Sequence, residues 1–313
     1  MKVAWLFPGQ GAQSVGMGHK LFSASTAARA VFERADAALG EPLSKLVFEG
    51  PEAELTRTAN AQPAIVTTSI AVLEAVKERY PQLPAPSFAA GHSLGEYSAL
   101  VASGALAFED AVRLVRARGR AMQEAVREGE GAMAAIMGLE GPALEAICVE
   151  AAKATGEVVS CANFNAPGQI VIAGAQKAVA AAQELASAQK GKAIPLKVSA
   201  PFHCALMAPA ARAVEAELAG IRVGDLAFPV VANVDAEPNV EPSRVKGLLV
   251  RQVDGAVRWE QAILRMRDEG VTHALELGPG KVLAGLVKRI AKDIKVLSVG
   301  DPESLDAVGA FLG

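Results

Sequence analysis

Residues 87–104 read SFAAGHSLGEYSALVASG, and this stretch decides the fold of the 313-residue chain. The apolar run at 87–90 predicts a strand, and residues 94–103 predict a helix that Gly104 ends. Between them, residues 91–95 form the pattern G-x-S-x-G. A strand, this pattern and a helix in succession are typical of the sharp turn that exposes a nucleophilic serine at the edge of an α/β sheet.

Ser93 is the predicted nucleophile. Its hydroxyl must project from a tight turn, and side chains at positions 91 and 95 would collide with neighbouring backbone, which explains both glycines. The helix that starts after Ser93 also directs backbone N–H groups towards any oxyanion that forms there. A strand-to-helix turn that merely uses small residues is the alternative, and the flanking strand and helix favour the functional interpretation.

Short apolar runs alternate with longer helix-like segments along the chain, which predicts an α/β fold with a largely parallel sheet. Residues 3–7 are predicted as the first strand, and Pro63 as the first residue of a helix that continues to about Tyr80. Residues 109–126 predict a longer amphipathic helix. Further strands of the same sheet are predicted at 230–233 and 273–277.

The middle of the chain has a different order of elements, β-α-β-β-α-β, which is that of a ferredoxin-like module. We therefore expect a small inserted subdomain at 128–198, between two segments of a larger, hydrolase-like α/β domain at 1–127 and 199–313. Its predicted strands are 131–139, 158–163, 169–173 and 193–198, and its predicted helices are 143–154 and 176–189.

A serine hydroxyl needs a base beside it. The histidines of the chain are His19, His92, His203 and His273. His92 adjoins Ser93 in the turn, so its side chain should diverge from the hydroxyl and support the turn from behind. His203 ends the Pro-containing segment 199–203, directly after the inserted module, where it can face a cleft. These residues alone leave open whether His203 is the base or an exposed loop histidine.

The Gly-rich segment 7–18 does not fit a phosphate-binding loop. A G-x-G-x-x-G pattern would need glycine where Ser14 stands, and a Walker motif would need lysine where Met17 stands. Dinucleotide and nucleoside triphosphate binding are therefore not expected. A loop after the first strand can instead supply a backbone N–H to an oxyanion hole, and Gln10 is the candidate donor. A flexible surface turn is the competing interpretation.

Arg118 interrupts an apolar stripe. Ala111, Val115, Arg118 and Met122 advance by four, three and four residues, which places them on one face of a helix. The arginines expected to be solvated on other faces are Arg113, Arg116, Arg120 and Arg127. A buried guanidinium requires an anionic partner. That partner is either an internal carboxylate or the carboxylate of a substrate, which arginine binds in bidentate geometry.

The composition narrows the classes of function. With 31 basic and 34 acidic residues the net charge is −3, which argues against broad nucleic-acid binding. Cys148, Cys161 and Cys204 lack metal-ligand spacing, so we expect no metal site and reduced thiols. The N-terminus does not resemble a leader peptide, and no apolar stretch is long enough to span a membrane, so we expect a cytoplasmic protein that does not enter membranes.

Together these features resemble the malonyl-CoA:acyl-carrier-protein transacylases of fatty-acid synthesis and the related acyltransferase domains of polyketide synthases. The resemblance covers nearly the whole chain and rests on several motifs in the same order, none of which is specific alone. The motifs are FPGQGAQ (7–13), QPA (62–64), GHSLGEY (91–97), RG (118–119), ANFN (162–165), PFH (201–203) and ELGPGK (276–281). The resemblance implies a hydrolase-like large domain with an inserted ferredoxin-like subdomain, as expected above.

The resemblance also implies roles for individual residues. Ser93 would be the nucleophile that becomes malonylated, and His203 its general base. The backbone N–H groups of Gln10 and Leu94 would form the oxyanion hole, and Arg118 would hold the free carboxylate of the malonyl group.

Further roles are implied for residues around this centre. The family uses a backbone carbonyl in place of an orienting aspartate, and Gln252 matches that position. Asn163 matches a residue that lines the site. In the polyketide relatives a Phe before the histidine accompanies malonyl, whereas a smaller residue admits methylmalonyl, so Phe202 suggests malonyl.

The implied reaction transfers malonyl from malonyl-CoA to the phosphopantetheine thiol of acyl carrier protein, through a malonyl-serine and without a cofactor. We expect a monomer that serves fatty-acid biosynthesis. The alternatives are an acyltransferase that supplies a polyketide synthase, a serine esterase or thioesterase, and an inactive scaffold of a synthase complex. An esterase would need an acidic third triad member, and a scaffold would have Ser93 or His203 buried or misaligned.

Overall fold

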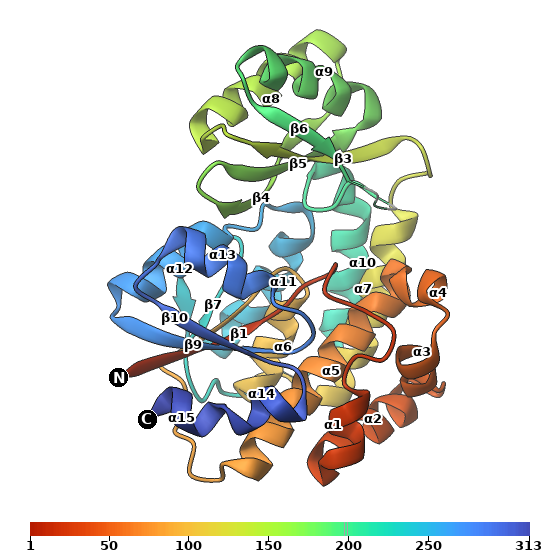
Figure 1. Cartoon of the computed structure of the whole chain (residues 1–313). Coiled ribbons are helices and arrows are strands. Elements are labelled where there is room, and N and C mark those ends of the chain that lie inside the picture. The colour runs from red at the N-terminus through yellow and green to blue at the C-terminus, as the bar shows by residue number, and fades with distance from the viewer. Residues whose placement is uncertain (197, 199) are drawn as a thin grey trace.

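The computed structural model describes residues 1–196, 198 and 200–313, and Figure 1 shows a large part with a smaller part above it. The strands of the large part are β1 (Lys2–Phe7), β2 (Phe88–Gly91), β7 (Val230–Val231), β8 (Pro238–Asn239), β9 (Val271–Leu277) and β10 (Lys295–Val299). In the described residues they form a six-stranded sheet with the order β10-β9-β1-β2-β7-β8. Neighbouring strands are parallel except for the antiparallel pair β7 and β8.

The sheet has a hydrophobic core on each face, because successive side chains of β1 point in opposite directions. Trp5 and Phe7 belong to one core, and Ala4 and Leu6 to the other. The first core receives side chains from α1 (His19–Ala24), α2 (Thr26–Leu39), α3 (Leu43–Glu49), α4 (Glu52–Thr56), α5 (Thr58–Arg79), α6 (Gly95–Ala102), α7 (Phe108–Glu124), η1 (Ala205–Met207), α10 (Ala208–Ala219), α11 (Pro242–Asp254), α14 (Pro302–Asp306) and α15 (Val308–Leu312). The second core is covered by α12 (Trp259–Asp268) and α13 (Val282–Ile290).

Helix α5 lies at the centre of the first core and is buried along most of its length. It packs against α2, α6 and α7. The prediction that this helix begins at Pro63 was wrong, because it begins at Thr58 and contains Pro63 in its interior. Gly119 of α7 lies against the backbone of Thr58 and Ala59, so tertiary packing holds this first turn in place.

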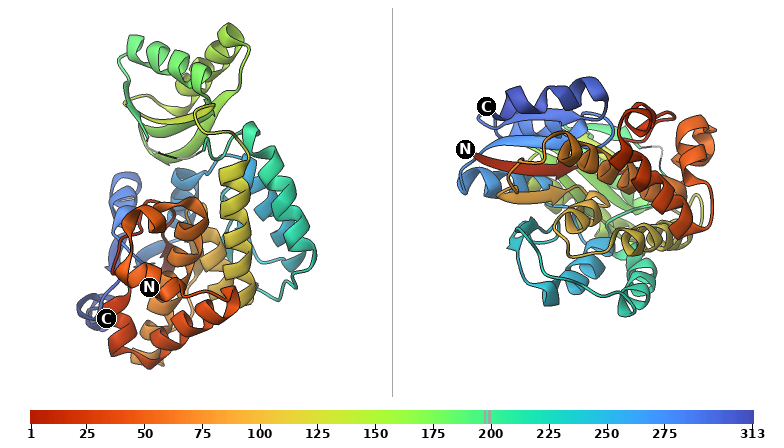
Figure 2. Two further views of the ribbon diagram at one scale, coloured as in Figure 1. Left: turned by 90° about the vertical axis from the view of Figure 1, so that its right-hand side faces the viewer. Right: turned by 90° about the horizontal axis from the view of Figure 1, so that it is seen from below.

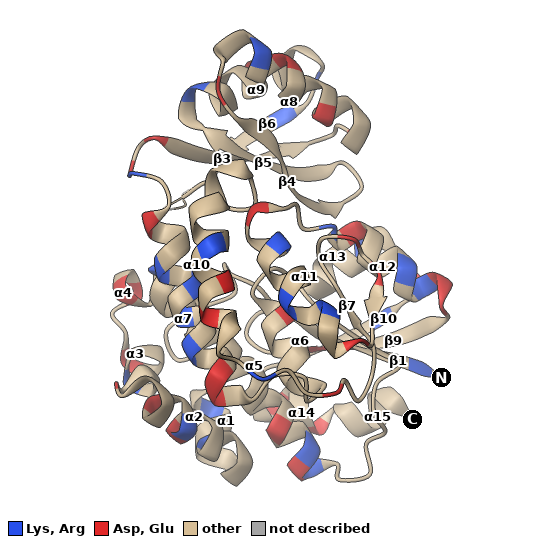
Figure 3. Ribbon diagram, turned by 180° about the vertical axis from the view of Figure 1, so that it is seen from behind, with Lys and Arg blue, Asp and Glu red and all other residues tan. Residues whose placement is uncertain are grey.

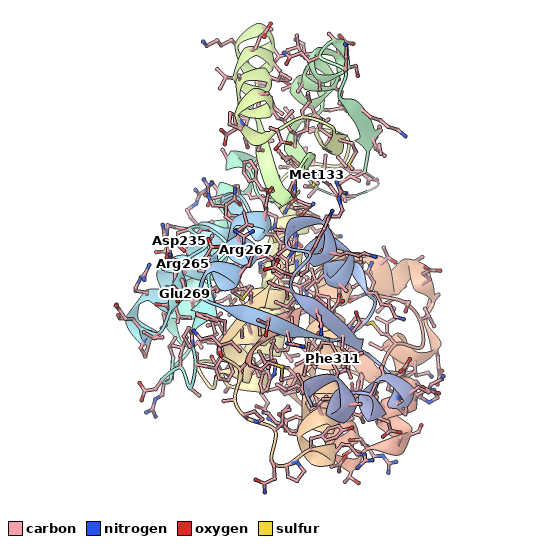
Figure 4. The ribbon with its side chains drawn as sticks, turned by 60° about the vertical axis from the view of Figure 1, so that its left-hand side comes forward. Met133, Asp235, Arg265, Arg267, Glu269 and Phe311 are labelled. Carbon is pink, nitrogen blue, oxygen red and sulfur yellow. The ribbon has the colours of Figure 1, made fainter. Side chains whose placement is uncertain are left out.

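The small part is the inserted β-α-β-β-α-β module, and its elements are β3 (Gly131–Met137), α8 (Gly141–Thr155), β4 (Val159–Ala166), β5 (Gln169–Ala175), α9 (Gln176–Ala188) and β6 (Lys192–Pro195). In the described residues its antiparallel sheet has four strands in the order β4-β5-β3-β6. Helices α8 and α9 cover the outer face (Figure 2). Met133 and Val171 on the inner face join the core of the large part, and Figure 4 labels Met133 at this junction. The predicted fold class, an α/β domain with a parallel sheet plus a small inserted antiparallel sheet, is confirmed.

Three predicted strands are shorter in the structure. The strand predicted at 131–139 ends at Met137. The strand predicted at 193–198 ends at Pro195, and Lys197 and Ser199 lie outside the described residues. The strand predicted at 230–233 is only Val230–Val231. It ends early because the backbone N–H of Asn233 donates to the carboxylate of Glu96, at 3.0 Å, and not to a neighbouring strand.

The glycines around Ser93 allow α6 to approach the sheet closely. A Cβ on Gly95 would overlap the backbone of Phe7 in β1, and a Cβ on Gly91 would overlap the backbone of Gly95. We expect Gly95→Ala to lower the free energy of unfolding by about 3 kcal/mol or more, because the overlapping atoms are backbone and cannot rotate away.

Urea unfolding measures this effect. The matched control is Gly247→Ala in α11, where an added Cβ meets no atom within 4 Å. A helical Gly→Ala change of this kind should leave the stability unchanged or raise it by up to about 1 kcal/mol. Equal stability of the two variants would contradict the assigned packing of α6.

Candidate active site

Ser93 occupies a strained turn between β2 and α6. Its φ of 50° lies in the left-handed region, which costs on the order of 1–3 kcal/mol for a residue other than glycine. The side chain of Asn233 stabilises this turn, since its Oδ1 accepts from the Ser93 N–H and its Nδ2 donates to the Gly91 carbonyl, both at 2.7 Å. Asn233 was not predicted to belong to the site, because no sequence motif links it to Ser93.

His203 contacts the hydroxyl of Ser93. The distance from Ser93 Oγ to His203 Nε2 is 2.7 Å, although 110 residues separate them in sequence. On the other side of the ring, Nδ1 lies 2.8 Å from the backbone carbonyl oxygen of Gln252. A carbonyl only accepts, so Nδ1 carries the ring proton and Nε2 is free to accept the proton of the hydroxyl. The structure therefore brings together the three predicted residues Ser93, His203 and Gln252.

The imidazole of His203 is held in its neutral form. Burial and then the positive charge of Arg118 lower the pKa of His203 to about 3, while the hydrogen bond to the Gln252 carbonyl acts in the opposite direction. At neutral pH the ring is therefore unprotonated and able to act as a base.

Arg118 lies next to the same hydroxyl and is 1% exposed. Its Nη2 donates to Ser93 Oγ at 3.1 Å and to Gln252 Oε1 at 2.9 Å, and its Nη1 donates to Gln62 Oε1 at 2.9 Å. Among the described residues no carboxylate forms an ion pair with it. Of the two partners considered for a buried guanidinium, the geometry favours a carboxylate supplied from outside the chain.

The prediction for Arg116, on the same helix, was wrong. It was expected to be solvated, but it is 9% exposed and contacts the carboxylate of Glu41 and the side-chain amide of Asn60. Helix α7 packs against α5, so its buried face is broader than the apolar stripe indicates. Arg116 has an internal carboxylate partner and Arg118 has none in the described chain, which distinguishes the two buried arginines.

A cavity of about 440 Å³ opens over Ser93. The predicted site residues that line it are Gln10, Ser93, Arg118, Asn163, Phe202 and His203. Met122 and Met133 add an apolar wall that comes from both parts of the molecule. A larger groove of about 1200 Å³ lies between α7, α9 and α10, but none of these predicted site residues lines it.

The N–H groups of Gln10 and Leu94 have no hydrogen-bond partner in the described part of the chain. Leu94 precedes α6 directly, so its N–H is one of the free donors of that helix terminus. The Gln10 side chain donates to Thr58 Oγ1 at 3.3 Å, which ties the loop after β1 to α5. These two N–H groups are therefore available to an oxygen bound in the cavity.

The described residues contain no group of three or more His, Cys, Asp or Glu side chains that could hold a metal ion. No helix among them is long and apolar enough to cross a membrane.

Comparisons with known proteins agree on one family. Residues 4–308 match the acyl transferase domain. The malonyl CoA-acyl carrier protein transacylase of Bacillus subtilis (strain 168) is 50% identical over 97% of this chain and 95% of its own. The transacylase of Escherichia coli (strain K12) is 46% identical over 97% of each chain.

Solved structures agree as well. An acyl-carrier-protein S-malonyltransferase from Bartonella henselae is 47% identical, covers 100% of both chains and superposes with a TM-score of 0.96. A malonyl-transacylase in complex with its type II PKS acyl-carrier protein is 44% identical, covers 98% of both chains and has a TM-score of 0.94.

The neutral state of His203 leads to a testable pH profile. A neutral serine reagent such as phenylmethylsulfonyl fluoride should modify Ser93 at nearly the same rate at pH 8 and pH 5.5, because the pKa of His203 is about 3. A histidine with the ordinary pKa of about 6.5 would slow the reaction about tenfold at pH 5.5. Mass spectrometry measures the rate, and Ser93→Ala is the unlabelled control. A tenfold loss at pH 5.5 would show that His203 titrates normally.

Proposed function

We propose that this chain, which belongs to the acyl transferase domain family, transfers a malonyl group from malonyl-CoA to the phosphopantetheine thiol of acyl carrier protein. The observation that carries the proposal is the guanidinium of Arg118, buried 3.1 Å from Ser93 Oγ without an ion-pair partner in the described chain. A group held on Ser93 would place a free carboxylate against this cation. Such a site selects dicarboxylic acyl groups over neutral ones.

The first half-reaction acylates Ser93. His203 Nε2 takes the hydroxyl proton while Ser93 Oγ attacks the thioester carbonyl, and the resulting oxyanion is bound by the N–H groups of Gln10 and Leu94. Such donors contribute on the order of 3 kcal/mol each to the lowering of the barrier. The carbon–sulfur bond then breaks, His203 returns the proton to the departing CoA thiolate, and malonyl-Ser93 remains.

The second half-reaction reverses these steps with a different thiol. The phosphopantetheine thiol of acyl carrier protein gives its proton to His203 and attacks the malonyl ester, and Ser93 leaves with that proton. One thioester is broken in the donor and one is formed in the acceptor, so the transfer requires no cofactor. Donor and acceptor use one site in turn, which gives ping-pong kinetics.

The partner of His203 distinguishes this proposal from an esterase. An esterase of this type would have a carboxylate at Nδ1, whereas here Nδ1 faces the carbonyl oxygen of Gln252. A neutral carbonyl orients the ring without adding the basicity that helps water attack, which favours an acyl-serine that waits for a thiol. The inactive scaffold is disfavoured because Ser93 and His203, although only 9% and 4% exposed, are aligned at 2.7 Å and both line the cavity.

Phe202 and Asn163 are proposed to shape the acyl site. Both line the cavity, Phe202 directly before the base and Asn163 from β4 of the small part. The ring of Phe202 is proposed to leave room for malonyl and to exclude a methyl branch. We assign the chain to fatty-acid biosynthesis in the cytoplasm, as a monomer, with supply of a polyketide synthase as the second candidate because one similar structure holds a type II PKS acyl-carrier protein.

The role of Ser93 is tested by Ser93→Ala. Without a hydroxyl no acyl-enzyme can form, so transfer from malonyl-CoA should fall by about 10⁴-fold or more. Intact-mass spectrometry after mixing with malonyl-CoA should show the malonyl adduct on the wild type and none on the variant. Release of free malonate without transfer to acyl carrier protein would support hydrolysis instead.

The role of Arg118 is tested by Arg118→Ala. Loss of a buried charge-assisted contact should lower the rate of malonyl transfer relative to acetyl transfer about a hundredfold. The matched control is Arg113→Ala on the same helix, whose exposed guanidinium pairs with Asp110 at 2.7 Å. Figure 3 shows charges of both signs along the helices on the rear of the molecule. Unchanged selectivity in Arg118→Ala would refute its role.

A further inference from the structure

Glu96 is a buried carboxylate directly behind the active site. It lies on α6 three residues after Ser93 and is 2% exposed. Its Oε2 accepts from Gln252 Nε2 at 2.7 Å and from the Asn233 N–H at 3.0 Å. No ion pair forms with it among the described residues. The half-reactions derived above give this carboxylate no role.

One amide connects Glu96 to Arg118. The Nε2 group of Gln252 donates to Glu96, and its Oε1 accepts from Arg118 Nη2 at 2.9 Å. The amide therefore lies between a buried anion and a buried cation, with its donor end towards the anion and its acceptor end towards the cation. This orientation of the amide dipole is electrostatically favourable. Glu96 and Arg118 therefore do not touch, but the side-chain amide of Gln252 bridges them.

The other ionisable groups that interact with Glu96 are Asp235 and Tyr97, and His203 contacts the backbone carbonyl of the same Gln252. Asp235, which Figure 4 labels, follows β7 in the chain, and its carboxylate lies 3.4 Å from Arg244 and 3.7 Å from Arg251. The hydroxyphenyl ring of Tyr97 lies under the Arg118 guanidinium at 5.4 Å, and burial raises the pKa of Tyr97 to about 12. Tyr97 and His203 are therefore neutral at pH 7, and Arg118 is the only cation that faces Glu96 through the amide among the described residues.

We propose that Glu96 is the removable countercharge of Arg118: above neutral pH it is ionised while the acyl site is empty, and it takes up a proton when the malonyl carboxylate occupies that site. This inference rests on the proposed function. With the site empty, Arg118 and ionised Glu96 sum to zero charge. Malonyl adds one negative charge to the same buried cluster, and a proton from solvent on Glu96 restores the balance. Glu96 is thus a positioning residue that acts through Gln252 and never touches the acyl group.

The ionisation behaviour of Glu96 agrees with this geometry. Burial raises the pKa of Glu96 to about 7, while the bonds from Gln252 and Asn233 and the charge of Arg118 lower it and the charge of Asp235 raises it. A carboxylate bound to Arg118 adds a second negative charge nearby and raises the pKa of Glu96 further. Protonated Glu96 favours malonyl binding. Malonyl binding should therefore weaken as pH rises through 7, whereas the binding of a neutral acyl group should not change with pH.

The first experiment counts protons. Ser93→Ala is titrated calorimetrically with malonyl-CoA at pH 7.5 in two buffers of different ionisation enthalpy. We expect uptake of roughly half a proton per site with malonyl-CoA and none with acetyl-CoA. This measurement keeps Glu96 intact, so it stands even if a variant at position 96 does not fold. Equal proton uptake with both ligands, or none with either, would overturn the proposal.

The second experiment measures selectivity against pH. The rates of Ser93 acylation by malonyl-CoA and by acetyl-CoA are compared at pH 6 and pH 8.5 by quenching and intact-mass spectrometry. In the wild type the malonyl-to-acetyl ratio should fall about sevenfold over this range, if the bound carboxylate raises the pKa of Glu96 from about 7 by about one unit. In Glu96→Gln, which keeps a hydrogen-bond acceptor but is always neutral, the ratio should stay constant at the wild-type value for pH 6.

The control is Glu260→Gln. Glu260 on α12 also has a pKa raised by burial but does not line the cavity, so this variant should keep the wild-type profile. A fall in the ratio of Glu96→Gln equal to that of the wild type would refute the countercharge. If the wild type forms no malonyl-Ser93 at any pH, the proposed function fails instead, so the two failures are distinguishable.

Discussion

Gln252 makes the contacts on which the rest of the site depends. Its backbone carbonyl accepts from His203. In its side chain, Oε1 accepts from Arg118, and Nε2 donates to Glu96 and to the backbone carbonyl of Ser93. A carboxylate at this position could not donate to Ser93, and it would neutralise Arg118 before any substrate arrived. Gln252 therefore orients the base through its backbone carbonyl and holds the cation through its neutral side-chain amide, without removing the charge that the cation needs for binding.

Backbone strain and the inserted module set the geometry around Gln252. Ser93 and His203 both have positive φ, at 50° and 61°, and both are held by tertiary contacts: Asn233 spans the serine turn, and Gln252 fixes the imidazole. The inserted module covers the cavity with Met133 and Asn163. A site assembled in this way is preorganised, because the cost of strain is met when the chain folds and not during each catalytic cycle.

The sequence predicted what local patterns can encode. Strand-turn-helix chemistry identified Ser93, and helical spacing showed that Arg118 points inward. The sequence did not reveal the contact of Asn233 with Ser93, that of Glu96 with Gln252, or that of Arg116 with Glu41. These contacts join residues between 75 and 156 positions apart. Periodicity describes one element at a time, whereas these contacts depend on how elements pack. The start of α5 at Thr58 was missed for the same reason.

A buried site that binds one charged group must remain stable while it is empty, when its own opposite charge has no ligand to pair with. Full neutralisation by an internal carboxylate, as for Arg116, would leave nothing for a ligand to bind, and no compensation at all would cost several kcal/mol of desolvation. Arg118 lies between these limits, with amide oxygens of Gln62 and Gln252 in contact and the nearest compensating anion one amide away. An indirect counterion of this kind stabilises the empty site, and it can be discharged by one proton when the ligand supplies its own anion. Selectivity for a carboxylate and stability of the unliganded fold can then coexist in one buried cluster.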